Sequence, residues 1–113
     1  MSARRSDAAR LDDIRRSADH LQEILRGGYE AFAHSWRSQS ATIRELDLIG
    51  EAASGISTLL RDRYPEVRWQ AMRGYREFAA QDSRRVNLEL VWKAVSAMSG
   101  LKEQLSRVIT KGE

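Results

Sequence analysis

The segment IRELDLIGEAASGISTLL, residues 43–60, decides the fold class. Its apolar residues recur at spacings of three and four, which is the pattern of one face of an amphipathic helix. These positions are Ile43, Leu46, Ile49, Ala53, Ile56 and Leu60. We expect one long helix from about Ala41 that ends before Tyr64-Pro65, because the residue before a proline avoids the helical region. Its small residues at 50–55 would let a neighbouring helix approach closely.

Apolar stripes of the same kind occur on both sides of this segment. A first helix is expected from Ser6 or Asp7 to Gly27-Gly28, and a short one over about residues 68–80. Residues 29–36 fit either a separate turn or the start of one long helix. Asn87 is a suitable N-cap for a last helix that continues to about Val108. Short connections between amphipathic helices predict an all-α fold, an up-and-down antiparallel bundle of four to five helices.

Length and composition limit the remaining possibilities. With 113 residues the chain is long enough for one core, so a single domain over residues 1–113 is expected. Cysteine is absent, which excludes disulfides and thiolate metal sites. No glycine-rich phosphate loop, zinc-protease motif or calcium loop occurs, and we predict no metal and no cofactor. No signal-peptide core and no membrane-length apolar stretch is visible, so we expect a cytoplasmic protein without a membrane partner.

Three blocks of the sequence carry a family resemblance. They are IRELDLIGEAA at 43–53, LRDRYPEVRWQAM at 60–72 and VNLELVW at 86–92. In order and spacing the chain resembles the HepT-like ribonucleases of the HEPN superfamily, from about Ser40 to the last helix. The resemblance implies a homodimeric helical toxin that cleaves RNA without metal, paired with a minimal nucleotidyltransferase as antitoxin.

The resemblance also places the family's catalytic motif on REFAAQDS, residues 76–83. That motif is an arginine, a polar residue, three further residues, a histidine, one residue and a tyrosine. Arg76 takes the arginine position and Glu77 the polar one. Gln81 replaces the histidine and Ser83 replaces the tyrosine.

These two replacements affect the expected chemistry. The amide of Gln81 can donate and accept hydrogen bonds but cannot transfer the proton that the motif histidine would move. Glu77 and Asp82 are titratable neighbours, although a carboxylate beside the scissile phosphate adds repulsion. In this family the antitoxin can add AMP to the motif tyrosine, and Ser83 offers a shorter, less acidic hydroxyl. Alternatively, Ser83 simply ends the short helix.

Four arginines surround the motif and have two interpretations. Arg73 and Arg76 are three residues apart and share a helix face, and Arg84-Arg85 follow the motif. They could form a phosphate-binding stripe, doubled if two chains bring their motifs to a common cleft. They could instead be solvated arginines paired with nearby acids, namely Glu77, Asp82 and Glu89.

The histidines and tryptophans lie outside the motif. His20 is expected on the wetter side of the first helix and His34 in a polar run, and nothing in the spacing places either histidine in a triad with a carboxylate. Trp69 and Trp92 belong to apolar stripes and are expected to pack in the core or a dimer contact. Trp36, between a serine and an arginine, is a candidate partner contact.

Three functions are therefore compatible with the sequence. The first is a HepT-like toxin-type partner of a nucleotidyltransferase that has lost most or all RNA cleavage. The second is an active metal-independent ribonuclease that uses Arg76 with a non-standard proton carrier. The third is a helical adaptor without a nucleic-acid role, whose small-residue seam serves dimer packing.

Overall fold

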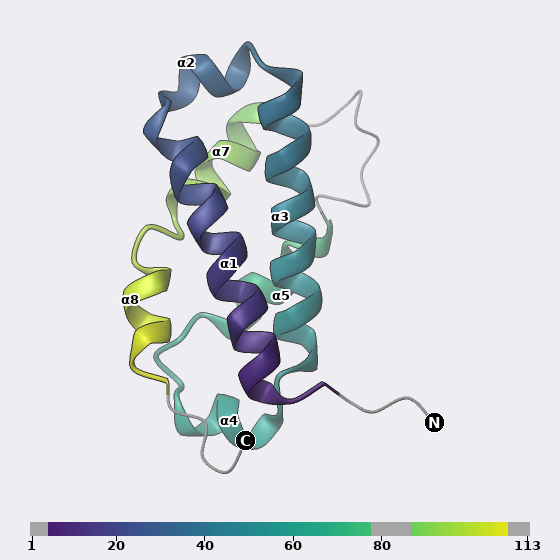
Figure 1. The fold of residues 1–113 in the computed structure, drawn as a ribbon, viewed down its shortest axis with the longest axis vertical. Helices are drawn as coiled ribbons and strands as arrows, with labels where there is room; N and C mark the ends of the chain where they lie inside the picture. Colours follow the sequence, from purple (N-terminus) through teal and green to yellow (C-terminus); the bar gives the residue numbers. More distant parts are fainter. Residues whose placement is uncertain (1–4, 78–86, 109–113) are drawn as a thin grey trace.

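The computed structural model describes residues 5–77 and 87–108. Every regular element in these ranges is a helix and none is a strand, so the all-α class is confirmed. Figure 1 shows the two long helices, α1 and α3, side by side and running in opposite directions along the long axis. The up-and-down bundle is therefore confirmed, although two of the expected helices are interrupted.

The pair α1 (Asp7–Arg26) and α3 (Trp36–Gly55) forms the frame of the bundle. Ser6 caps α1 by accepting a hydrogen bond from the Ala9 amide at 3.1 Å, and Ser35 caps α3 in the same way from Ser38. The short helix α2 (Gly28–Ala33) joins them at one end of the molecule (Figure 1). The segment up to Ala33 thus forms a separate short helix, and α3 begins at Trp36, about five residues earlier than predicted.

The expected single helix through residue 63 is wrong, because the chain breaks at Ile56. Ile56 is extended, with ψ of 137°, and Ser57 caps a new helix, α4 (Thr58–Arg63). The carboxylate of Asp7 accepts hydrogen bonds from the Ser57 amide at 2.9 Å and the Ser57 hydroxyl at 2.6 Å. Side-chain bonds of this kind compete with the helical pattern, and here they tie the start of α4 to the start of α1.

The last predicted helix is also interrupted. Asn87 caps α7 (Leu88–Ser96) as predicted, accepting from the Leu90 amide at 3.1 Å. A turn over residues 97–100 then separates α7 from α8 (Leu101–Ser106), and Arg68 donates to the Ala97 carbonyl at 2.7 Å. Gly100 stands at this break, where its low helix propensity favours a turn.

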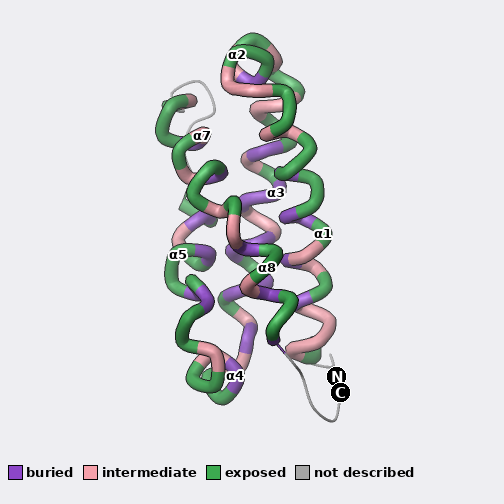
Figure 2. Tube along the Cα trace, turned by 90° about the vertical axis from the view of Figure 1, so that its left-hand side faces the viewer, coloured by how far each residue is buried: buried purple, intermediate pink, exposed green. Residues whose placement is uncertain are grey.

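Aliphatic and aromatic side chains from all these helices form one core, and Figure 2 shows the buried residues on the inward sides of the helices. Trp69, which begins α5 (Trp69–Gly74), is buried and donates its indole N–H to the Tyr64 carbonyl at 2.9 Å. Trp92 packs against Phe32, with ring centroids 5.2 Å apart. Both tryptophans therefore pack as predicted.

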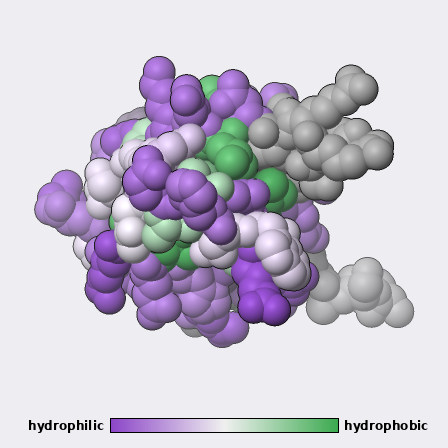
Figure 3. All heavy atoms as spheres, turned by 90° about the horizontal axis from the view of Figure 1, so that it is seen from above, coloured by the Kyte–Doolittle hydropathy of each residue, from purple (hydrophilic) through white to green (hydrophobic). Residues whose placement is uncertain are grey.

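The surface is mainly hydrophilic in the view onto the α2 end of the molecule (Figure 3). Trp36 is 69% exposed there and lies under the Arg37 guanidinium, 5.3 Å from the ring centroid. Among the described helices, none is long and apolar enough to cross a membrane.

Candidate functional site

The arginine of the predicted motif is held against the C-terminal half of α3. A β-carbon added at Gly50 would lie 2.5 Å from Cγ of Arg76, 3.0 Å from its backbone nitrogen and 3.1 Å from the Met72 carbonyl oxygen. Such distances leave no room for a larger residue at position 50. The small residue therefore sets how closely the chain around Arg76 packs on α3, as the sequence predicted for this seam.

The guanidinium of Arg76 has one carboxylate beside it from α3. Its Nε lies 3.9 Å from Oδ1 of Asp47, and both side chains are about half exposed. An exposed pair at this distance is weak and screened by solvent. Arg76 can therefore exchange this partner for a phosphate at small energetic cost.

The neighbours of Arg76 present polar groups to solvent. Arg73 is exposed and donates to Gln70 Oε1 at 3.4 Å, and Glu77 is exposed. Gln81, Ser83, Arg84 and Arg85 lie outside the described residues, as does Asp82. Their proposed roles stay predictions, and so does the pairing of the four arginines with nearby acids.

Tyr75 fixes the chain on the other side of Arg76. Its ring is buried in the core. Burial raises the pKa of the Tyr75 hydroxyl above its usual value, and the positive charge of Arg68 opposes this shift. Because Tyr75 is buried and Arg76 is exposed, the chain presents the guanidinium outward.

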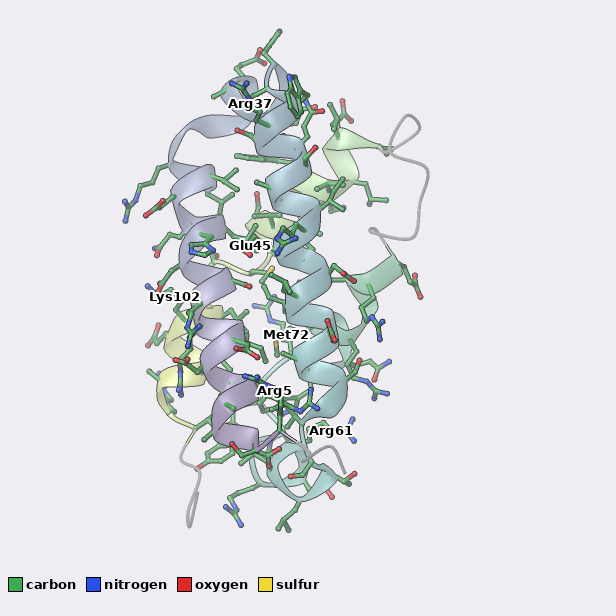
Figure 4. The ribbon with its side chains drawn as sticks, turned by 45° about the vertical axis from the view of Figure 1, so that its right-hand side comes forward. Arg5, Arg37, Glu45, Arg61, Met72 and Lys102 are labelled. Carbon is green, nitrogen blue, oxygen red and sulfur yellow. The ribbon has the colours of Figure 1, made fainter. Side chains whose placement is uncertain are left out.

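A second polar cluster, which the sequence did not predict, lies between α1 and α3. Glu45 is only 10% exposed, and its carboxylate contacts Nδ1 of His20 and accepts a hydrogen bond from Ser17 Oγ at 3.3 Å. His20 itself is 63% exposed, which confirms its place on the wetter side of α1. In Figure 4 Glu45 lies at mid-height between the two helices. The sequence feature that could have predicted this cluster is Glu45 itself, a charged residue beside the apolar Leu46 and Ile49 on the inner side of its helix.

The pair of Arg76 and Asp47 lies on one side of α3, and the cluster of His20, Ser17 and Glu45 lies on the opposite side. Glu45 and Asp47 are two residues apart, so their side chains point roughly 200° apart around the helix. His20 is therefore directed away from Arg76 within one chain. Among the residues that the structure describes, no group of three His, Cys, Asp or Glu side chains is placed to hold a metal ion.

Comparison with known proteins identifies the family. The model of the HepT-like family, described as "Ribonuclease HepT-like", matches residues 14–108, which include both clusters. The chain belongs to this family. It is similar to "Probable ribonuclease HepT" of Thermococcus cleftensis, with 30% identity over 81% of this chain and 84% of the relative.

Two further relatives cover most of this HepT-like chain. A protein of Methanocaldococcus jannaschii, provisionally named an RNase, is 32% identical over 82% of this chain and 86% of its own length. One of Caldanaerobacter subterraneus, named in the same way, is 24% identical over 89% of this chain and 92% of its own. No solved structure shows a significant match. The sequence resemblance to HepT-like ribonucleases is thus confirmed.

Proposed function

We propose that this HepT-like chain is the toxin-type component of a toxin–antitoxin pair with a minimal nucleotidyltransferase, and that its own RNA cleavage is impaired. The observation that carries the proposal is the family match over residues 14–108, set against Gln81 and Ser83 at the motif histidine and tyrosine positions. Arg76 keeps the motif arginine in an exposed position.

The impairment follows from proton chemistry. Cleavage of RNA without metal requires a group that takes a proton from the 2′-hydroxyl and one that returns it to the leaving oxygen. The side-chain amide of Gln81 does not gain or lose a proton near neutral pH. His20, which is held by Glu45, lies on the far side of α3 from Arg76. The chain therefore retains a phosphate ligand but lacks the proton carrier.

The proposed partners rest on the same family membership. We propose a homodimer in which two copies bring their Arg76 regions to a common cleft that binds RNA phosphates, with the nucleotidyltransferase as a further partner. The small-residue seam supports contacts within the chain, since Gly50 packs on Arg76 and Gly55 lies against the Arg10 guanidinium. Light scattering at micromolar concentration should return twice the chain mass, and a monomer mass would contradict the dimer.

The experiment that tests impaired cleavage compares three purified proteins on a mixed RNA pool with chelator present. These are the native chain, Arg76→Ala, and the double variant Gln81→His with Ser83→Tyr. We expect cleavage from the double variant alone. Specific cleavage by the native chain that disappears in Arg76→Ala would overturn the proposal.

That last outcome would establish the second candidate, an active metal-independent ribonuclease. The observation that favours it is the pair of carboxylates near Arg76, Asp47 at 3.9 Å and the adjacent Glu77. Either could serve as a non-standard proton carrier, and Asp47→Asn and Glu77→Gln would then separate their contributions. The third candidate, an adaptor without a nucleic-acid role, predicts no RNA retention at low salt, whereas phosphate contacts predict retention that falls steeply with salt.

A further inference from the structure

A groove runs between α1 and α3 on the side of α3 away from Arg76. It encloses a cavity of about 410 Å³, within the range of small-molecule sites. Arg5 and Glu45, labelled in Figure 4, lie at different heights along it. The wall residues used below are Arg10 towards one end, Ser17, His20 and Glu45 towards the other, and Leu48, Glu51 and Ala52 between.

The Arg10 end holds an arginine without an ion-pair partner among the described residues. Two other arginines of the groove are engaged, Arg5 with Asp13 at 3.0 Å and Arg16 with Asp12. Arg10 forms no ion pair with any residue in the described ranges, and its Nε is buried without a hydrogen-bond partner. Its guanidinium lies against Gly55, where an added β-carbon would overlap it. A buried donor without a partner is costly, and an anion bound at this end would supply the missing charge.

The other end offers directed hydrogen-bonding groups. The carboxylate of Glu45 holds Nδ1 of His20, so the second ring nitrogen, Nε2, remains for a ligand. The Ser17 hydroxyl is buried and fixed to the same carboxylate. A ligand at this end therefore meets a fixed set of groups rather than mobile surface side chains.

The spacing of the two ends fits a nucleotide. Arg10 and His20 are ten residues apart on α1, which places them about 15 Å apart along the helix. Leu48 and Ala52 form an apolar stretch between the ends, and the exposed carboxylate of Glu51 can accept hydrogen bonds from sugar hydroxyls. We propose that this groove binds a nucleoside monophosphate, with the phosphate at Arg10 and the base edge at His20, Glu45 and Ser17.

Calorimetric titration of the full chain with each of the four ribonucleoside monophosphates tests the proposal. Inorganic phosphate and the phosphate-free nucleosides are titrated as fragments. We expect saturable 1:1 binding of at least one monophosphate, and weaker binding of both of its fragments. Arg10→Met should weaken that binding at least about tenfold, because charged hydrogen bonds to the phosphate are lost. Arg107→Met removes the same charge from an exposed arginine on the C-terminal side of α8 and should leave binding within twofold.

A second variant protects the test against misfolding. Gly55→Ala keeps every charge but displaces the Arg10 guanidinium, so it should weaken binding while thermal unfolding stays cooperative. The proposal is overturned by absence of binding to the native chain, by equal affinity for inorganic phosphate, or by native-like affinity in Arg10→Met. Binding of single-stranded oligonucleotides but no mononucleotide would also overturn it. Because the groove faces away from Arg76, none of these outcomes depends on RNA cleavage.

Discussion

Gly50 of α3 and Arg76 pack so closely that a β-carbon at position 50 would lie 2.5 Å from Cγ of Arg76. Part of this contact is with backbone, at 3.0 Å from the Arg76 nitrogen and 3.1 Å from the Met72 carbonyl oxygen. Backbone cannot rotate away as a side-chain end can. The position of the motif arginine relative to α3 therefore depends on the residue at position 50.

We expect Gly50→Ala to lower the free energy of unfolding by about 1–3 kcal/mol, as overpacking does elsewhere. Gly74→Ala is the matched control, because a β-carbon there meets nothing within 4 Å and alanine favours the helix. Urea unfolding of both variants checks the prediction. An unchanged urea midpoint for Gly50→Ala would show that α3 and the segment around Arg76 can move apart without loss of stability.

The core and surface leucines should respond very differently to truncation. Leu46 is fully buried in α3, and Leu46→Ala should cost about 2–5 kcal/mol through lost burial and the cavity left behind. Leu59 is 70% exposed, and the same substitution there should change stability by less than about 0.5 kcal/mol. Thermal unfolding of the pair measures the difference, and similar losses would mean that Leu59 is covered in solution.

The tie between Asp7 and Ser57 should contribute measurably to stability. Asp7→Ala removes two charge-assisted hydrogen bonds to the start of α4, and we expect a loss of about 1.5–3 kcal/mol. Asp12→Ala serves as the control, since Asp12 has the same charge on the same helix and its ion pair, with Arg16, is exposed. Equal effects of the two variants in urea unfolding would show that the tie is not formed in solution.

Removal of the carboxylate near Arg76 should strengthen RNA binding if Arg76 contacts phosphate. Losing the weak pair frees the guanidinium, so Asp47→Asn should raise RNA affinity by about two- to threefold at low salt. Glu103→Gln, which removes an exposed charge paired with Arg107, controls for the change in net charge. Fluorescence anisotropy with labelled RNA is the measurement. A gain of the same size in both variants would indicate a general charge effect.

Tyr75 should make the protein less stable in alkaline solution. Its folded-state pKa is raised above the usual value of 10.0, so above that pH the unfolded chain loses the proton more readily than the folded one. The contribution of Tyr75 to the free energy of unfolding is complete below about pH 10 and is lost as the pH rises through the pKa of Tyr75 in the folded state. Urea unfolding from pH 8 to 11 should show a smaller decline for Tyr75→Phe than for the native chain. Parallel declines would contradict the assignment to this hydroxyl.

Apolar periodicity was sufficient to predict the helices and the fold class, but it does not report where a helix is interrupted. The stripe of α3 continues through Ile56 and Leu60 in correct register, whereas the break depends on Asp7, fifty residues away. Likewise, Arg68 binds the carbonyl that ends α7, a contact between distant segments. Ser57 and Gly100 are local signals at these two breaks, but the hydrogen bonds that join distant segments carry no local sequence pattern.

The same limit explains what was missed at the sites. Arg76 was found through the family motif, and its packing on Gly50 agrees with the small-residue seam. The cluster of His20 and Glu45 joins residues 25 apart on two helices, so only the packing of α1 on α3 brings them together. A glutamate within an apolar stripe is the sequence feature that marks such a partner.

Hydrogen bonds from α1 reach far along the chain. Asp7 binds Ser57, and Arg15 donates to the Leu105 carbonyl at 2.8 Å across 90 residues of sequence. Because a chain is made from its N-terminal side, α1 is synthesised well before Leu105, the partner of Arg15. The packing of α1 is thus completed only after a segment ninety residues further along has been made.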